Sequence, residues 1–132
     1  MDTQARTQRD STSTTSLQRV GGVLLLVLAV IHVLVYVGFS LTPAYPGFLF
    51  LINVAASVAL AVGVLVGFRP AWHASALFAA GTIALFVIVR TVGLPAFHLT
   101  DWVAMVGFLP LGPLSLVADG LLIALYAVDR SR

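Results

Sequence analysis

Charge is the scarcest property of this chain. Across the 109 residues of the segment 20–128, the only formal charges are those of Arg69, Arg90, Asp101 and Asp119. About a quarter of the residues of a typical soluble domain are charged, whereas here 9% are charged and 60% are hydrophobic. A globule of this composition has too few polar side chains to cover its surface in water. The sequence therefore excludes a water-soluble domain and makes lipid the solvent for most of the chain.

Other absences exclude further classes of protein. The chain has no cysteine, which excludes disulfide bonds, thiolate metal sites and thiol catalysis. It also has no lysine and no dense basic patch, so we expect no nucleic-acid partner. A glycine-rich phosphate loop, an HExxH motif, a GxSxG motif and an acidic metal cluster are all missing. We therefore expect no enzymatic activity and no cofactor.

The apolar runs divide the chain into four predicted membrane helices. A helix needs about 20 residues to cross roughly 30 Å of hydrocarbon, and prolines and glycines mark the predicted helix ends. The predicted helices cover about residues 20–40, 48–68, 72–93 and 110–128. The prediction is thus an all-α fold, an integral membrane four-helix bundle formed by residues 20–128. Residues 102–109 are either an interfacial segment or part of the fourth span.

The two ends of the chain are polar. Residues 1–19 are rich in Ser, Thr and Gln, which predicts a disordered N-terminal tail, and residues 129–132 form a short polar C-terminal tail. A cleaved signal peptide is a competing interpretation, but the apolar run continues to Leu41 without a small-residue cleavage site. Six of the seven arginines fall on one side of a four-span arrangement: Arg6, Arg9, Arg19, Arg69, Arg130 and Arg132. By the positive-inside rule we expect a multi-pass protein of the cell membrane with the N-terminus and the C-terminus both cytoplasmic.

Small residues recur every four positions in the second and third predicted helices. The second helix carries them at Ala55, Ala59, Gly63 and Gly67, and the third at Ala76, Ala80 and Ala84. Such a pattern lets two helix backbones approach closely in lipid. The sequence therefore predicts that these two helices pack against each other along the two rows of small residues.

Each predicted span carries one polar or ionisable residue: His32, Asn53, Arg90 and Asp119 in chain order. Such residues are costly in the bilayer, so they face the interior of a bundle and find partners there. We therefore expect the four to form an intramembrane polar centre that binds a ligand or a proton. Counting along the helices puts His32 and Asp119 near the midplane as a central pair, and Asn53 and Arg90 in the outer half.

The remaining polar residues suggest partners for Arg90 and argue against a metal site. Asp101 and His98 lie in the segment after the third span, so we expect them to meet Arg90 at the outer surface. The three histidines, His32, His73 and His98, fall at three separate depths. This separation predicts no metal site and no bis-histidine haem.

Several short segments resemble a group of proteins. Residues 90–98 contain R-T-x-G-L-P, and residues 111–119 read L-G-x-x-S-L-x-x-D. The chain thereby resembles uncharacterised small four-span integral membrane proteins of actinobacteria and haloarchaea, in which the first segment ends the third span and the second forms the fourth. Ile31-His32 and the segment 45–50 are similar as well. The resemblance implies the four-span fold and carries no activity over to this chain.

Three functions fit these features. The leading hypothesis is a non-enzymatic small polytopic membrane protein, an accessory or small-ligand-binding component with a polar intramembrane centre. The first alternative is a proton-coupled small transporter or channel subunit, which needs a homo-oligomer or a larger membrane complex because four helices enclose little of a pathway. The second alternative is a haem or quinone-type redox membrane subunit. The expected surroundings are the lipid bilayer in each case.

Overall fold

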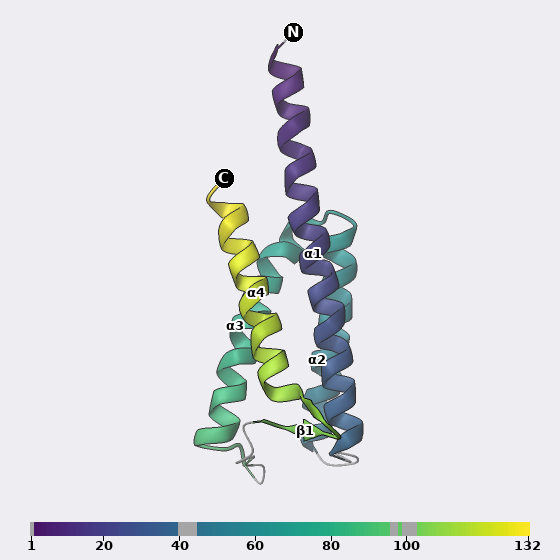
Figure 1. The fold of residues 1–132 in the computed structure, drawn as a ribbon, viewed down its shortest axis with the longest axis vertical. Helices are drawn as coiled ribbons and strands as arrows, with labels where there is room; N and C mark the ends of the chain where they lie inside the picture. The colour runs from purple at the N-terminus through teal and green to yellow at the C-terminus, as the bar shows by residue number, and fades with distance from the viewer. Residues whose placement is uncertain (1, 40–44, 96–97, 99–102) are drawn as a thin grey trace.

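The computed structural model describes the backbone of residues 2–39, 45–95, 98 and 103–132, and side chains from Ser16 onward within these ranges. The described residues form four helices, α1 Asp2–Gly38, α2 Tyr45–Leu65, α3 Arg69–Thr91 and α4 Leu111–Arg130 (Figure 1). Each contains a segment long and apolar enough to cross a membrane, and in α1 this segment is Ser16–Gly38. The predicted all-helical fold with four candidate membrane-spanning helices is confirmed.

The helices form an up-and-down bundle. α1 packs most extensively against α2 and also against α4, while α3 packs against both α2 and α4. Both chain termini and the turn between α2 and α3 lie at one end of the bundle, which we name the terminus end (Figure 1). A short β hairpin lies at the opposite end, which we name the hairpin end. Each polar residue can therefore be placed by its distance from one of these two ends.

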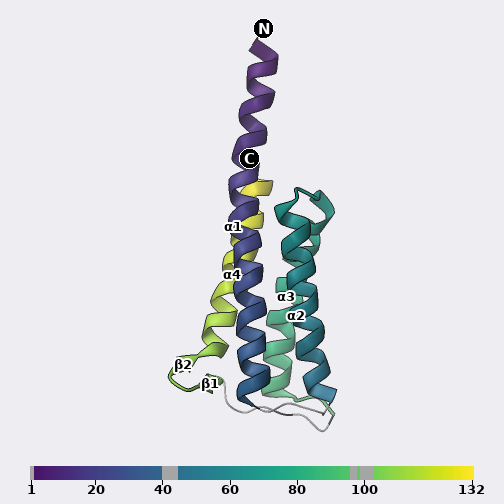
Figure 2. The same cartoon turned by 90° about the vertical axis from the view of Figure 1, so that its right-hand side faces the viewer.

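The N-terminal segment differs from its prediction. α1 begins at Asp2, so the helix continues through the residues for which the sequence predicts a disordered tail. The physical reason is that residues 2–20 contain neither proline nor glycine, so nothing interrupts the backbone hydrogen bonds of the spanning helix. The extension projects beyond the other three helices (Figures 1 and 2). At the other end of the chain, α4 runs on to Arg130, two residues past the predicted span.

Three prolines, Pro46, Pro70 and Pro113, lie in the first turn of a helix. α2 begins at Tyr45 and α3 at Arg69, each about three residues earlier than predicted, so Pro46 and Pro70 both fall in a first helical turn. A proline is tolerated there because the N–H groups of the first turn have no partner within the helix. Residues 66–68 form the turn that joins α2 to α3.

The segment before α4 is neither helix nor irregular loop. Strands β1 Met105–Val106 and β2 Leu109–Pro110 pair antiparallel, with Val106 opposite Leu109. Gly107 has a φ of +63°, and glycine at the first position of a two-residue turn is typical of a type II′ hairpin. Among the described residues of the segment 102–109 there is thus a hairpin, and the fourth helix begins only at Leu111.

Two apolar clusters form the core. The cluster nearer the terminus end consists of Leu25, Ala61, Val64, Ala71, Trp72, Ala79 and Leu122. The cluster nearer the hairpin end consists of Ile31, Val35 and Leu111, with Phe39, Phe50 and Val106 packed against it. Large apolar side chains are also exposed on the outer faces of all four helices, among them Val37, Phe48, Leu77 and Val117. Such a surface suits lipid, because soluble monomers rarely expose large apolar patches.

The predicted packing of α2 against α3 is confirmed, but most of the small residues take no part in it. A Cβ atom at Gly63 of α2 would lie 2.7 Å from the Cβ of Ala71 of α3, so this glycine does lie close to α3. Ala55 and Ala59 of α2 are exposed, and so are Ala80 and Ala84 of α3. α2 instead buries residues at helical spacing, Ser57, Ala61 and Val64, and its most extensive partner is α1. Most of the repeated small residues thus lie on faces outside the bundle, so the repeat predicted the neighbouring helix but not the residues that contact it.

Candidate functional site

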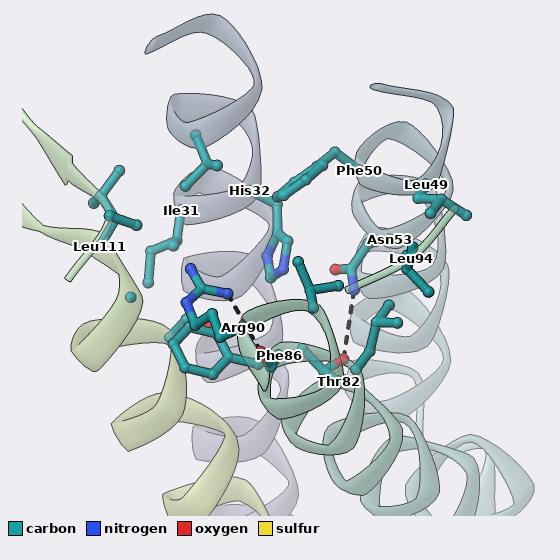
Figure 3. A pocket seen from close by; sticks show the side chains of 16 residues that line it. Ile31, His32, Leu49, Phe50, Asn53, Thr82, Phe86, Arg90, Leu94 and Leu111 are labelled. Carbon is teal, nitrogen blue, oxygen red and sulfur yellow. Dashed lines mark hydrogen bonds between the residues drawn. The ribbon is translucent and has the colours of Figure 1, made fainter. Parts of the chain in front are cut away.

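A pocket of about 90 Å³ lies in the hairpin half of the bundle, and residues of all four helices line it (Figure 3). Its wall is mostly apolar. Its polar lining side chains are His32, Asn53, Thr82, Arg90 and Ser115. Three of the four residues predicted to form a polar centre therefore meet at one pocket, and the fourth, Asp119, does not line it.

His32 brings an imidazole ring from α1 to the pocket. Its Nδ1 donates a hydrogen bond of 2.7 Å to the backbone oxygen of Leu28, and the ring lies 5.9 Å from the ring of Phe50 between centroids. Because a carbonyl oxygen only accepts, Nδ1 must carry hydrogen, and in the neutral ring Nε2 is then an acceptor. His32 therefore offers the pocket an acceptor that its own helix does not use.

His32 lies in the half of α1 that is nearer the hairpin end. The membrane-length part of α1 is Ser16–Gly38, so its midpoint is close to Val27. His32 lies six residues from Gly38, which places it about 9 Å from the hairpin end of the helix. This position brings His32 to the pocket. The expectation that His32 lies near the midplane of the membrane stays a prediction.

Asn53 and Thr82 connect α2 to α3 across the pocket. The Nδ2 of Asn53 donates to the Oγ1 of Thr82 at 3.4 Å, and its Oδ1 accepts from the hydroxyl of the buried Ser57, also at 3.4 Å. Donor–acceptor distances in protein hydrogen bonds are usually about 3 Å, so both of these bonds are long and therefore weak. Asn53 is thus held in place without a strong bond between the two helices.

Arg90 supplies the charge at the pocket. Its guanidinium carbon lies 3.6 Å from the centroid of the Phe86 ring, and its Nη1 donates to the Phe86 backbone oxygen at 3.4 Å. Stacking of a cation on an aromatic face contributes up to about 2 kcal/mol where water is excluded. Figure 3 shows the guanidinium, the His32 ring and the Asn53 carboxamide pointing toward the middle of the pocket. Thr82, Phe86 and Arg90 recur at a spacing of four, so they share one face of α3.

The two predicted outer-surface partners of Arg90 have different outcomes. The Nε2 of His98 donates to the backbone oxygen of Arg90 at 3.3 Å, so the described contact is with the backbone and not with the guanidinium. Asp101 lies outside the described residues. The prediction of an ion pair between Asp101 and Arg90 therefore stays a prediction.

Asp119 is separate from the pocket. It is fully buried on α4, and neither of its carboxyl oxygens has a hydrogen-bond partner among the described residues. The predicted pair with His32 is therefore not formed, because the Nδ1 of His32 bonds within its own helix and the ring lies nearer the hairpin end. Ser115, which lines the pocket, is one helical turn from Asp119, or about 6 Å along the axis.

The sequence did not identify all the polar groups of the site. Thr82 was missed, although its spacing of eight residues from Arg90 on one helix places both on the same face. The aromatic residues Phe50 and Phe86 gave no signal, because phenylalanine is common throughout the apolar runs. Within the described part of the chain, no three His, Cys, Asp or Glu side chains come together as ligands for a metal ion.

Comparison of the chain with protein-family models, with curated proteins and with solved structures finds no match. The resemblance to small four-span membrane proteins therefore stays a prediction that depends on short sequence segments. Any function has to be inferred from the pocket itself.

Proposed function

We propose that this chain is a non-enzymatic, multi-pass integral membrane protein that binds a small ligand in the pocket between His32, Asn53 and Arg90. The observation that carries the proposal is the convergence of these three side chains, from three helices, on a pocket whose remaining wall is mostly apolar. Small-molecule sites typically combine an apolar wall with a few convergent polar groups. Ionisable residues within membrane helices are costly, which favours a functional role for them.

We further propose that the protein lies in the cell membrane with both termini in the cytoplasm. Arg19, Arg69, Arg130 and Arg132 all belong to the terminus end of the bundle. Cytoplasmic ends of membrane helices carry an excess of arginine and lysine. Arg90 departs from this pattern because it lines the pocket at the opposite end. In this orientation the pocket lies in the outer half of the membrane.

A pair of matched substitutions tests the ligand-binding function. Val35 lines the pocket and is 8% exposed, whereas Val37, two residues further along the same helix, is 65% exposed and does not line it. Val35→Phe places extra side-chain volume in the pocket, and Val37→Phe places it outside the bundle. Native mass spectrometry of protein purified in mild detergent should detect a co-purifying small molecule on the parent and on Val37→Phe, but not on Val35→Phe.

A second matched pair of substitutions, on the opposite wall of the pocket, shows whether a loss of ligand in the first pair comes only from misfolding. Val89 lines the pocket and is buried, while Val87 of the same helix is exposed. Val89→Phe should lose the small molecule and Val87→Phe should retain it, with thermal unfolding used to show that each variant is folded. Two results would contradict a ligand in this pocket. One is that all four variants carry the same bound species, and the other is that neither the parent nor any variant carries one.

Asp119 favours a second candidate function, a proton-coupled transporter or channel subunit that acts as an oligomer. Its carboxyl group is fully buried, has no described partner and lies one turn from the pocket residue Ser115. Buried carboxyl groups of this kind carry protons through membrane proteins. Vesicles that contain the protein and a pH-sensitive dye should then show proton flux, which Asp119→Asn should abolish. Flux equal to that of empty vesicles would exclude this function.

A further inference from the structure

The pocket lies where two helices separate. α2 and α3 are joined by the turn 66–68 at the terminus end, and at the hairpin end they lie apart (Figure 1). At the depth of the pocket, the described polar contact between them is the long hydrogen bond from Asn53 to Thr82. A bond of 3.4 Å is weak. The two helices are therefore held together only loosely on this side of the pocket.

The wall of the pocket on this side is apolar and reaches the outside of the bundle. Leu49 of α2 and Leu85 of α3 both line the pocket, and they are 36% and 39% exposed. Leu49 lies about 6 Å from the hairpin end of α2, and Leu85 lies about 9 Å from the hairpin end of α3. Both leucines are thus within the membrane-length helices. In a membrane-inserted bundle, the pocket would meet hydrocarbon chains here and not water.

The size and charge of the pocket limit what it holds. Apolar cavities of about 150 Å³ bind benzene, so a pocket of about 90 Å³ accommodates a polar head group and the first few carbons of a chain. Among the described lining residues, Arg90 is the one with a formal charge, and it is positive. A molecule with an acidic head group suits this charge, and the rest of its chain must leave the pocket.

We propose, on the basis of the ligand-binding function above, that the ligand is a single-chain amphiphile with a carboxylic acid head group, which enters sideways from the membrane between Leu49 and Leu85. The head group binds as a carboxylate, because the guanidinium beside it favours the ionised acid, and one carboxylate oxygen accepts from Arg90. The proton that the acid releases goes to the Nε2 of His32, which is an acceptor because Nδ1 already bonds Leu28, and the resulting imidazolium donates to the second carboxylate oxygen. The hydrocarbon tail leaves between the two leucines into the lipid.

Cysteine labelling tests this entry route, because the chain contains no cysteine of its own. Ser115→Cys places a thiol in the pocket, and Val117→Cys places one on the exposed face of the same helix as a control. Protein in vesicles is treated with dodecyl methanethiosulfonate, which dissolves in lipid, or with sulfonatoethyl methanethiosulfonate, which stays in water. We expect the lipid-soluble reagent to label both thiols and the water-soluble reagent to leave the pocket thiol unmodified, as read by mass spectrometry.

The two leucines are tested as the entrance. Leu49→Trp with Leu85→Trp should narrow the gap and slow the labelling of the Ser115→Cys thiol by the lipid-soluble reagent. Leu51→Trp with Val87→Trp, on exposed residues that do not line the pocket, should leave the rate unchanged. Unchanged labelling of the Val117→Cys thiol in both backgrounds shows that the bundle is inserted and folded.

Competition identifies the head group. Dodecanoate should protect the Ser115→Cys thiol from labelling. Dodecanol, which has the same chain and no acid, and propionate, which is an acid without the chain, should not protect it.

Protection by propionate, or labelling of the pocket thiol by the water-soluble reagent, would overturn entry from the membrane. Equal protection by dodecanol would overturn the acidic head group. A pocket thiol that neither reagent reaches, beside a labelled Val117→Cys thiol, would also overturn the proposal. None of these results depends on whether Val35→Phe loses a co-purifying molecule, so failure of this inference is distinguishable from failure of the proposed function.

Discussion

Gly21 of α1 leaves room for the ring of Trp72, which reaches it from α3 at the terminus end of the bundle. A Cβ atom at this position would lie 2.4 Å from Cζ3 and 2.8 Å from Cη2 of Trp72, and 3.4 Å from Cδ1 of Leu122. The Trp72 ring has little freedom to move away. Its Nε1 donates to the Oδ2 of Asp129 at 2.8 Å, and its ring packs against the ring of Tyr126 with 5.9 Å between centroids and an interplanar angle of 61°. Gly21→Ala therefore introduces a methyl group where a rigid, hydrogen-bonded ring already lies.

The expected loss of stability follows from these distances. Ordinary carbon contacts are about 3.5 Å or longer, so the ring atom at 2.4 Å would have to move by about 1 Å. Overpacking of this kind typically destabilises a core by about 1–3 kcal/mol. Alanine in place of glycine inside a helix favours folding by up to about 1 kcal/mol, which offsets part of the clash.

A matched control removes the helix-propensity contribution. Gly120 also lies inside a helix, and a Cβ atom there meets nothing within 4 Å. Gly120→Ala should therefore gain the same propensity without a clash, and its free energy of unfolding should exceed that of Gly21→Ala by about 1–3 kcal/mol. Unfolding in mixed detergent and SDS, followed by circular dichroism, measures both values. The loss of stability caused by Gly21→Ala should be smaller in a protein that already carries Trp72→Phe than in the parent protein. Equal stability of the two alanine variants would refute the close approach of α1 to Trp72.

Two further predictions concern Asp119 and the topology. Asp119→Asn should change the free energy of unfolding by about 1 kcal/mol or less, because one buried polar group without a described partner replaces another. A loss of about 3–5 kcal/mol would instead indicate a buried ion pair with a group outside the described residues. A reporter fused after Arg132 should be active in the cytoplasm, and one inserted after the exposed Phe108 of the hairpin turn should be active outside. The opposite pair of signals would contradict the orientation proposed from the arginines.

The sequence by itself determined the number of helices and most of the pocket's polar residues. A membrane-length helix is a local property, since about 20 apolar residues in a row are enough to specify it. The turn residues and prolines then placed most boundaries to within a few residues. His32, Asn53 and Arg90 were found for a related reason: a polar side chain in an apolar helix has to face the interior of the bundle, whichever helices surround it.

Only the tertiary structure decided which residues make the contacts between neighbouring helices. The small residues of α2 and α3 predicted that these helices are neighbours, but most of them are exposed and take no part in the contact. His32 and Asp119 were expected to pair but do not. Contacts of this kind depend on where one helix lies against another, as where the ring of Trp72 of α3 lies against Gly21 of α1. Such a contact joins side chains that are far apart in the sequence, so no single segment contains the information that sets it.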